Sequence, residues 1–324
     1  MHQLSWLEAI VIGALQGVAE LFPVSSLGHS VLLPAVIGGQ WATDLDVSAP
    51  ESPYLAFVVG LHVATALALI VFFRRDWARI VRGLVTSVVR REIVTPDQRL
   101  GWLLVLGTVP VGLAGLLLEH VFRVWLSRPV PTAAFLVLNG LVLLGVEALR
   151  RRPVADRAPR HAGVAAGRSG GAVDAPTVVL GPEETLDRSP DVASDRRLAG
   201  MPWLRALGIG AAQIAALCPG ISRSGVTMSA GLLRGLSHED AARFSFLLST
   251  PVILAAGVLK LGDLAGPLGD GVRPQILVGS LLSFAGAYLS VRYLTRYFEH
   301  RSLRPFGIYC IVVGVGCLLW FTLR

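Results

Sequence analysis

The strongest constraint on the fold of this chain is a set of six apolar stretches, each about as long as a membrane-spanning helix. Crossing a hydrocarbon core of ~30 Å takes ~20 helical residues, and a spanning backbone must satisfy its own hydrogen bonds, as a helix does. Only 16% of the 324 residues are charged, whereas soluble domains have about 25%. The six stretches are Tyr54–Phe73, Leu100–Leu118, Pro131–Leu149, Ala241–Leu261, Pro274–Leu294 and Pro305–Leu323. The sequence therefore predicts an all-α polytopic membrane protein with six transmembrane helices.

The arginines of the chain concentrate in three of the segments between these stretches, at 74–99, 150–197 and 292–304. The segment 39–53 has no arginine and carries two aspartates and a glutamate. By the positive-inside rule, the three basic segments face the cytoplasm and the acidic segment faces outward. The net charge of +7 therefore reflects membrane topology, and we expect no nucleic-acid partner.

Two further apolar regions are interrupted by polar turns and are too short on either side to be simple spans. The first runs through 4–37 and breaks at Pro23, and the second runs through 204–233 and breaks at Pro219. Irregular backbone at membrane depth is tolerated only where it is buried in protein or lines a wet cavity. Each region is therefore predicted to form a re-entrant helical hairpin.

The two hairpins resemble each other, since Ile12-Gly-Ala-Leu-Gln16 matches Ile209-Gly-Ala-Ala-Gln213. Each hairpin precedes three spans, so we predict an internal duplication, with 1–149 as the first repeat and 203–324 as the second. Three is an odd number, so the second repeat must be inverted, and the hairpins then meet near the midplane, where inverted repeats build their sites. The segment 150–202 has few large apolar residues and is predicted to be a disordered cytoplasmic linker.

The first polar turn combines an acid, hydroxyls and an imidazole. Gln16 and Glu20 are four residues apart and share a helix face, and Ser25 or Ser26 can cap the following helix, whose free N–H groups bind anions. His29 lies one turn further on, so Ser26 (or Ser25), His29 and Glu20 outline a nucleophile, a base and an orienting group. Alternatively, Glu20 with Gln16 as a neutral oxygen donor can hold a divalent cation that bridges phosphates.

The second polar turn supplies positive charge and N–H donors. Ser222 is a natural helix N-cap, and the planar guanidinium of Arg223 suits bidentate phosphate binding. Gly225 leaves room for backbone approach, and Thr227 lies four residues after Arg223 on the same face. The predicted phosphate-binding residues are Ser25, Ser222, Arg223, Ser224 and Gly225. For Ser222 and Ser224, helix capping or a hydrogen bond to a neighbouring helix is the alternative.

Together the two turns resemble the undecaprenyl-diphosphate phosphatase family of the bacitracin-resistance type. Residues 16–29 match its Glu/Gln-x-x-x-Glu and Pro-Val-Ser-Ser-x-Gly-His elements, and residues 219–227 match Pro-Gly-x-Ser-Arg-Ser-Gly-x-Thr. The similarity covers nearly the whole chain outside 150–202. It implies a bacterial plasma-membrane enzyme that hydrolyses undecaprenyl diphosphate to the monophosphate, recycling the lipid carrier of cell-wall synthesis. It also implies an active site that faces outward and a divalent cation, Mg²⁺ or Ca²⁺.

Matching the motifs residue by residue implies a role for five side chains. Ser26 matches the nucleophile, Glu20 the essential carboxylate, His29 the family histidine, Arg223 the phosphate-binding arginine and Thr227 the family threonine. The predicted metal-binding residues are Glu20 and Gln16.

Three features depart from the family pattern. Gln16 stands where many members have Glu, Leu27 replaces a common Thr, and the linker is unusually long. The rival function is a transporter or flippase for a phosphorylated lipid, because inverted repeats with broken helices are the usual plan of secondary transporters. A transporter needs no nucleophile, so Ser26→Ala separates the two functions. The sequence leaves the oligomeric state open, a homo-oligomer included.

Overall fold

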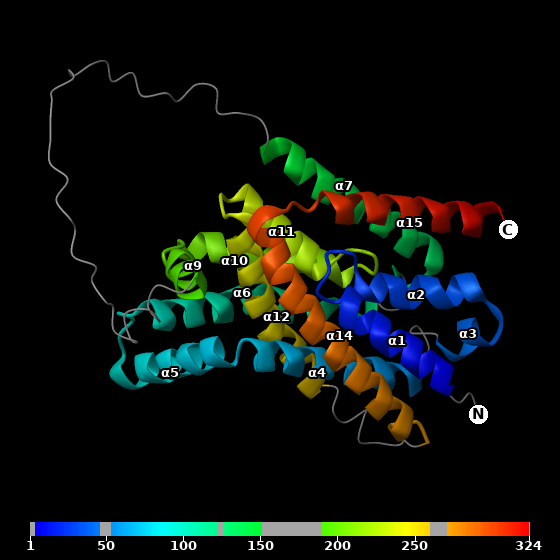
Figure 1. Cartoon of the computed structure of the whole chain (residues 1–324), viewed down its shortest axis with the longest axis horizontal. Coiled ribbons are helices and arrows are strands. Elements are labelled where there is room, and N and C mark those ends of the chain that lie inside the picture. Colours follow the sequence, from blue (N-terminus) through cyan, green and yellow to red (C-terminus); the bar gives the residue numbers. More distant parts are fainter. Residues whose placement is uncertain (1–3, 46–52, 122–125, 151–189, 260–270, 324) are drawn as a thin grey trace, which may run out of the picture.

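The structure is a computed structural model that describes residues 4–45, 53–121, 126–150, 190–259 and 271–323, and within these residues the chain is helical, with no strand (Figure 1). The helices are α1 (Trp6–Ala19), α2 (Ser26–Ile37), α3 (Gly39–Asp44), α4 (Pro53–Phe72), α5 (Arg74–Arg90), α6 (Pro96–Val121), α7 (Pro129–Arg150), α9 (Pro190–Ala199), α10 (Trp203–Ala212), the 3₁₀ helix η2 (Gln213–Leu217), α11 (Arg223–Leu233), α12 (His238–Leu259), α14 (Arg273–His300) and α15 (Arg304–Leu323).

The predicted spans correspond to long apolar helices. Helices α6, α7, α12, α14 and α15 are each long and apolar enough to cross a membrane. The remaining predicted span forms α4, which meets the basic helix α5 at 88°. The all-α polytopic fold is therefore confirmed, with five such spans among the described residues, or six when the bent pair is counted.

Both interrupted regions form helix–turn–helix hairpins. The first consists of α1 and α2, and α1 begins with a capping box in which Ser5 and Glu8 satisfy each other's backbone N–H groups. The second consists of α10, η2 and α11. The N-cap residues Ser25 and Ser222 stand at matching places, since each accepts a hydrogen bond from the N–H group three residues ahead.

The packing of the two halves is reciprocal. Helix α1 of the first hairpin packs on α14, and α10 of the second packs on α6. Glycines permit both close approaches: a Cβ at Gly13 would lie 2.6 Å from the carbonyl oxygen of Gly279, and one at Gly210 would overlap the carbonyl oxygen of Gly107. The first helix of each hairpin thus packs on a long helix of the other half of the chain, as expected for two repeats related by a two-fold axis. The inverted orientation in a bilayer stays a prediction.

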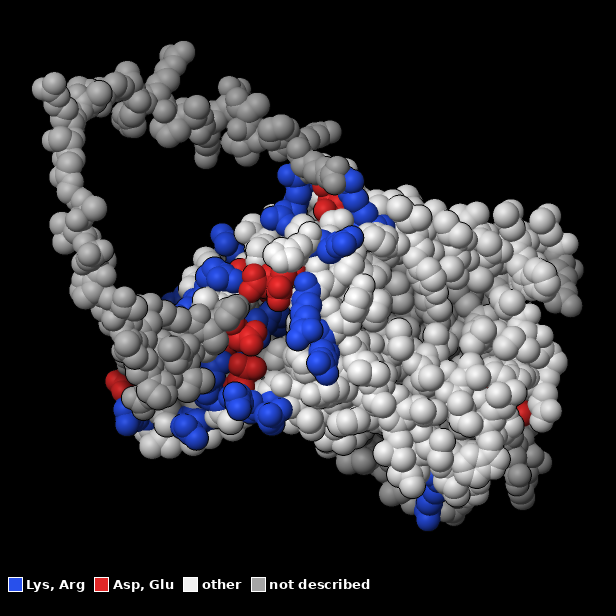
Figure 2. All heavy atoms as spheres, in the orientation of Figure 1, with Lys and Arg blue, Asp and Glu red and all other residues white. Residues whose placement is uncertain are grey.

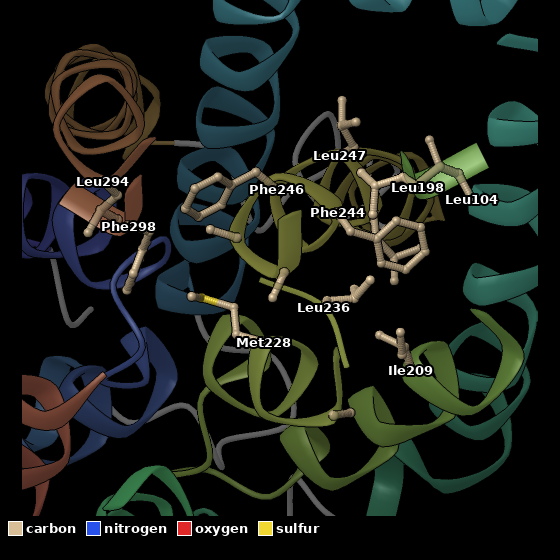
Figure 3. Close-up of a cluster of buried hydrophobic side chains, with 14 of the residues drawn as sticks. Leu104, Leu198, Ile209, Met228, Leu236, Phe244, Phe246, Leu247, Leu294 and Phe298 are labelled. Atoms are coloured by element: carbon tan, nitrogen blue, oxygen red, sulfur yellow. The ribbon is translucent and has the colours of Figure 1, made fainter. Parts of the chain in front are cut away.

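A large apolar cluster joins the second hairpin to the surrounding helices (Figure 3). Phe244, Phe246 and Leu247 of α12 lie fully buried at its centre. They pack with side chains from α6, α9, α10, α11 and α14, and this cluster holds the turn of the second hairpin in place. In a membrane protein such contacts stabilise the fold through close packing of side chains.

The prediction of a disordered linker over 150–202 is wrong for its last part. Residues 190–199 form α9, in which Leu198 is fully buried in the cluster of Figure 3. Asp195 of α9 is also buried and pairs with Arg243 of α12 and Arg79 of α5 at 2.7 Å each. Composition suggested a solvated segment, but buried ion pairs and one apolar anchor order this helix. Residues 151–189 lie outside the described residues.

Candidate active site

The polar turns of the two hairpins meet inside the protein. The backbone N–H of Gly220 donates to Ser25 Oγ at 3.2 Å, and Ser224 Oγ donates to the carbonyl oxygen of Phe22 at 3.2 Å. Hydrogen bonds therefore run in both directions between turns that lie about two hundred residues apart in the sequence.

Asn139 of α7 forms hydrogen bonds to both turns. This side chain is fully buried; its Nδ2 donates to the carbonyl oxygen of Pro23 at 3.1 Å and to Cys310 Sγ at 3.3 Å. Its Oδ1 accepts from the backbone N–H of Ser222 at 3.1 Å. One amide thus satisfies a buried backbone group from each turn, a role that the sequence patterns did not indicate.

Glu20 is the centre of the site. It caps the C-terminal end of α1 and is 8% exposed. Its Oε1 accepts from Arg223 Nη2 at 2.5 Å, and its Oε2 accepts from Gln16 Nε2 at 3.0 Å and from Ser26 Oγ. The acid of the first hairpin is therefore paired with the arginine of the second, which removes the large penalty of an unpaired charge in such surroundings.

The two adjacent serines do different work. Ser25 has a positive φ of 69° and caps α2; its Oγ accepts from the N–H groups of Gly28 and Gly220. Two N–H donors already occupy that oxygen, so it has a structural task. Ser26 begins α2 with its hydroxyl directed at the Glu20 carboxylate. The geometry favours Ser26 over Ser25 as the reactive hydroxyl.

Arg223 is placed by the start of α11. Ser222 caps this helix through the N–H of Gly225, and Thr227 Oγ1 donates to the carbonyl oxygen of Arg223 at 2.7 Å. Arg223 Nη2 binds Glu20, whereas its Nη1 is buried and has no hydrogen-bond partner within the described part of the chain. A buried guanidinium with a donor to spare suits a phosphate oxygen.

Ser224 and Thr227 contact the protein itself. The hydroxyl of Ser224 binds Phe22, and that of Thr227 binds its own helix. Neither these two residues nor Gly225 lines the cavity described below. Their contacts hold the turn of the second hairpin and the first turn of α11 in shape around Arg223.

His29 is directed away from Ser26. Its Nδ1 must donate to the carbonyl oxygen of Ser25, at 2.7 Å, because a carbonyl only accepts. Its Nε2 faces the hydroxyl of Tyr309 of α15 at 2.8 Å, and the two rings stack. In this arrangement His29 supports the strained turn at Ser25 and does not touch the Ser26 hydroxyl.

His62 of α4 belongs to the site although the sequence patterns did not single it out. Its Nδ1 donates to the carbonyl oxygen of Val58 at 2.8 Å, and its Nε2 lies 3.6 Å from Glu20 Oε2. An ionisable side chain inside a predicted span is a functional candidate by default, so this signal was present in the sequence.

A cavity of about 170 Å³ lies between the two turns. One water needs only ~10–15 Å³ on this measure, so the cavity has room for a polar headgroup. Its polar lining consists of Glu20, Ser25, Ser26, His62, Gln213, Ser222 and Arg223. Its apolar lining consists of Leu27, Val111, Ala216, Leu217, Ile221, Val252, Ile253 and Ala256. A polar centre inside an apolar wall suits a ligand that is charged at one end and apolar at the other.

The donor set fits a divalent cation only in part. Gln16 presents its nitrogen to Glu20, and no group of three His, Cys, Asp or Glu among the described residues is arranged to hold a metal. A Ca²⁺ cage of 6–8 oxygens is therefore not preformed, whereas Mg²⁺ is commonly held by one or two carboxylates together with substrate phosphates. These residues fit a cation that arrives with phosphate oxygens and takes Glu20 as its protein ligand.

The fold and the site define a class: a polytopic α-helical membrane protein in which two helical hairpins share one buried polar centre. Within that class, the chain matches the family described as bacitracin resistance protein BacA over residues 9–316. It is 60% identical to the undecaprenyl-diphosphatase of Mycolicibacterium paratuberculosis, over 99% of both chains. It is 54% identical to undecaprenyl-diphosphatase 1 of Frankia casuarinae, again over 99% of both chains. The chain belongs to the bacitracin resistance protein BacA family.

Proposed function

We propose that this protein is a membrane phosphatase that hydrolyses undecaprenyl diphosphate to undecaprenyl phosphate and inorganic phosphate. One observation carries the proposal: the Glu20 carboxylate binds the Ser26 hydroxyl of one hairpin and the Arg223 guanidinium of the other, at the wall of one cavity. The names of the relatives support the same substrate, and family membership supports a part in bacitracin resistance.

The residues account for a two-step hydrolysis. Ser26 Oγ attacks the terminal phosphorus, its proton passes to Glu20 Oε2, and the bond from that phosphorus to the bridging oxygen breaks, so that the lipid monophosphate leaves. Water then attacks the phosphoserine and the bond from phosphorus to Ser26 Oγ breaks; one proton of the water restores the Ser26 hydroxyl, and the proton held by Glu20 leaves with the inorganic phosphate. Arg223 stabilises the negative charge of the phosphoryl group through Nη1 while Nη2 keeps its bond to Glu20. In a one-step route, Ser26 would orient the attacking water instead.

We further propose that a divalent cation, Mg²⁺ rather than Ca²⁺, accompanies the substrate and neutralises its phosphate oxygens. Glu20 would hold it, with Gln16 contributing only after its amide has turned. The proposed location is the bacterial plasma membrane, with the cavity reached from the side of the acidic segment 39–53. A water-soluble short-chain diphosphate, hydrolysed by right-side-out but not by inverted vesicles, would support that orientation.

Phosphate release from a long-chain polyprenyl diphosphate by the purified protein tests the function. Ser26→Ala should lower the rate by about a thousandfold or more, and Arg223→Ala by about 10²–10³-fold. Ser25→Ala should lower the folding stability and should have a smaller effect on the rate of the chemical step. The matched fold control is Ser249→Ala, which removes a buried hydroxyl in the middle of α12 that is not among the residues lining the cavity.

Two outcomes would change the proposal. Substrate binding without phosphate release by well-folded wild-type protein would indicate a lipid transporter. Release that survives Ser26→Ala at more than about a tenth of the wild-type rate would keep the enzyme and exclude Ser26 as the nucleophile.

A further inference from the structure

The C-terminal end of α14 carries a surface cavity that is wide open to the outside and separate from the candidate active site; all of its lining residues belong to this one helix or its C-cap. It has a volume of about 670 Å³ and is lined by Arg292, Tyr293, Arg296, Tyr297, His300 and Arg301, with Leu289 at its apolar end. From Leu289 to His300, these residues follow one another at intervals of one to four and so form one face of the helix. Figure 2 shows basic side chains, with acidic ones among them, gathered toward this end of the molecule, beside a wide uncharged surface.

Unlike three arginines on α5, α9 and α12, the arginines of this cavity have no acidic partner within the regions that the structure describes. Arg79, Arg197 and Arg243, on α5, α9 and α12, each form ion pairs with aspartates. Within the regions that the structure describes, no ion pair engages Arg292, Arg296 or Arg301. The neighbourhood therefore neutralises one set of arginines internally and leaves the other set open to an external anion.

The same face changes from apolar to charged along the helix axis. Leu289 is 63% exposed and Tyr293 is 55% exposed, and Arg301 follows Leu289 by about 18 Å at ~1.5 Å per residue. Aromatic side chains with a polar tip concentrate at the level of lipid headgroups, and basic pockets at the cytoplasmic ends of spans bind anionic headgroups. An acyl chain can lie along Leu289 while a phosphate lies among the arginines.

We propose that this cavity binds the phosphodiester headgroup of an anionic phospholipid of the inner leaflet. Arg292, Arg296 and Arg301 supply the charge, and Tyr293 and Tyr297 form the floor. The site is linked to the first hairpin, because Tyr293 stacks on Phe22 with ring centroids 6.1 Å apart, and the Phe22 carbonyl accepts the Ser224 hydroxyl. A bound headgroup therefore stabilises the helix end on which the hairpin turn rests. This inference does not depend on the proposed phosphatase reaction.

Native mass spectrometry of the purified full-length protein, titrated with phosphatidylglycerol or with phosphatidylcholine, tests the site. The variant Arg292→Gln/Arg296→Gln/Arg301→Gln should lose about fivefold in phosphatidylglycerol affinity per arginine, and so about a hundredfold in all. The charge-matched control Arg82→Gln/Arg90→Gln/Arg91→Gln changes three exposed arginines on or next to α5 and should stay within about threefold of wild type. The melting temperature of each variant without added lipid establishes that it is folded.

Three results would overturn the proposal. Equal losses in both triple variants would reduce the effect to general positive charge. Competition by millimolar inorganic phosphate as strong as that by the lipid would make the cavity a plain phosphate site. Tighter binding of a polyprenyl monophosphate than of phosphatidylglycerol, abolished by the cavity variant, would assign the cavity to the reaction product instead.

Discussion

Replacing Asn139 by Leu tests whether the two hairpin turns hold each other in place. The substitution keeps the branched shape of the side chain and removes both hydrogen-bonding functions from a fully buried position. It leaves the Pro23 carbonyl and the Ser222 N–H without the partners that they have at 3.1 Å each. A buried polar group left unsatisfied costs about 1–3 kcal/mol, so the two together should lower the free energy of unfolding by about 2–6 kcal/mol.

The lower part of that range applies if Cys310 donates to the Pro23 carbonyl in place of Asn139. Its Sγ lies 3.7 Å from the Pro23 carbonyl oxygen, and a thiol is only a weak donor. Among the described residues no such substitute is present for the Ser222 N–H, which belongs to the cap of the helix that positions Arg223. The activity should therefore fall as well, by about a hundredfold for a displacement of about 1 Å.

Denaturant titration in mixed micelles measures the free energy of unfolding, and phosphate release measures the activity. Ser249→Ala is the matched control, because this buried hydroxyl donates only to the carbonyl of Ser245 in its own helix, at 2.7 Å. Its loss should cost no more than about 1 kcal/mol. If Asn139→Leu proves as stable as Ser249→Ala and equally active, the hydrogen bonds of Asn139 do not hold the two turns in place and the prediction is wrong.

Two further predictions concern helix packing and the cation. Gly210→Ala would place a Cβ against the backbone of Gly107, whereas the Cβ of Gly112→Ala meets open space. Thermal unfolding should show that Gly210→Ala lowers the free energy of unfolding by about 1–3 kcal/mol. Gly112→Ala should raise it by about 1 kcal/mol or less. Equal effects would contradict the close approach of α10 and α6. EDTA should leave the melting temperature of the substrate-free protein unchanged and abolish diphosphate binding measured with a labelled lipid. A large drop in melting temperature without substrate would indicate a preformed metal site.

Much of the architecture could be predicted because a bilayer restricts the options. Length and apolarity alone predicted the spans, and the breaks at Pro23 and Pro219 predicted the turns of the two hairpins. The helix α9 could not be predicted in this way. Its stability rests on Asp195 meeting Arg79 and Arg243, and composition does not show which charges are paired across the fold.

The candidate-site residues that belong to a sequence motif could be predicted, whereas those that reach the site only through tertiary packing could not. Glu20, Ser26 and Arg223 lie together as their motifs suggest. His29, by contrast, lies against Tyr309, a neighbour that no local pattern reveals. Asn139 and His62 come from separate helices, so their approach to the turns depends on packing that a single sequence does not display.

The predicted duplication would explain how one site acquires opposite charges. In the two hairpins Gln16 corresponds to Gln213, Ser25 to Ser222 and Gly28 to Gly225, all at one constant spacing along the chain. With this alignment, Glu20 corresponds to Leu217, and Ser26, the first residue of α2, corresponds to Arg223, the first residue of α11. Two identical hairpins would bring two carboxylates, or two arginines, to one buried point, where like charges repel strongly. Divergence at these two positions instead gives one hairpin the acid and the hydroxyl and the other the guanidinium. Since neither charge is tolerable there unpaired, we expect the candidate site to form only when both turns are in place.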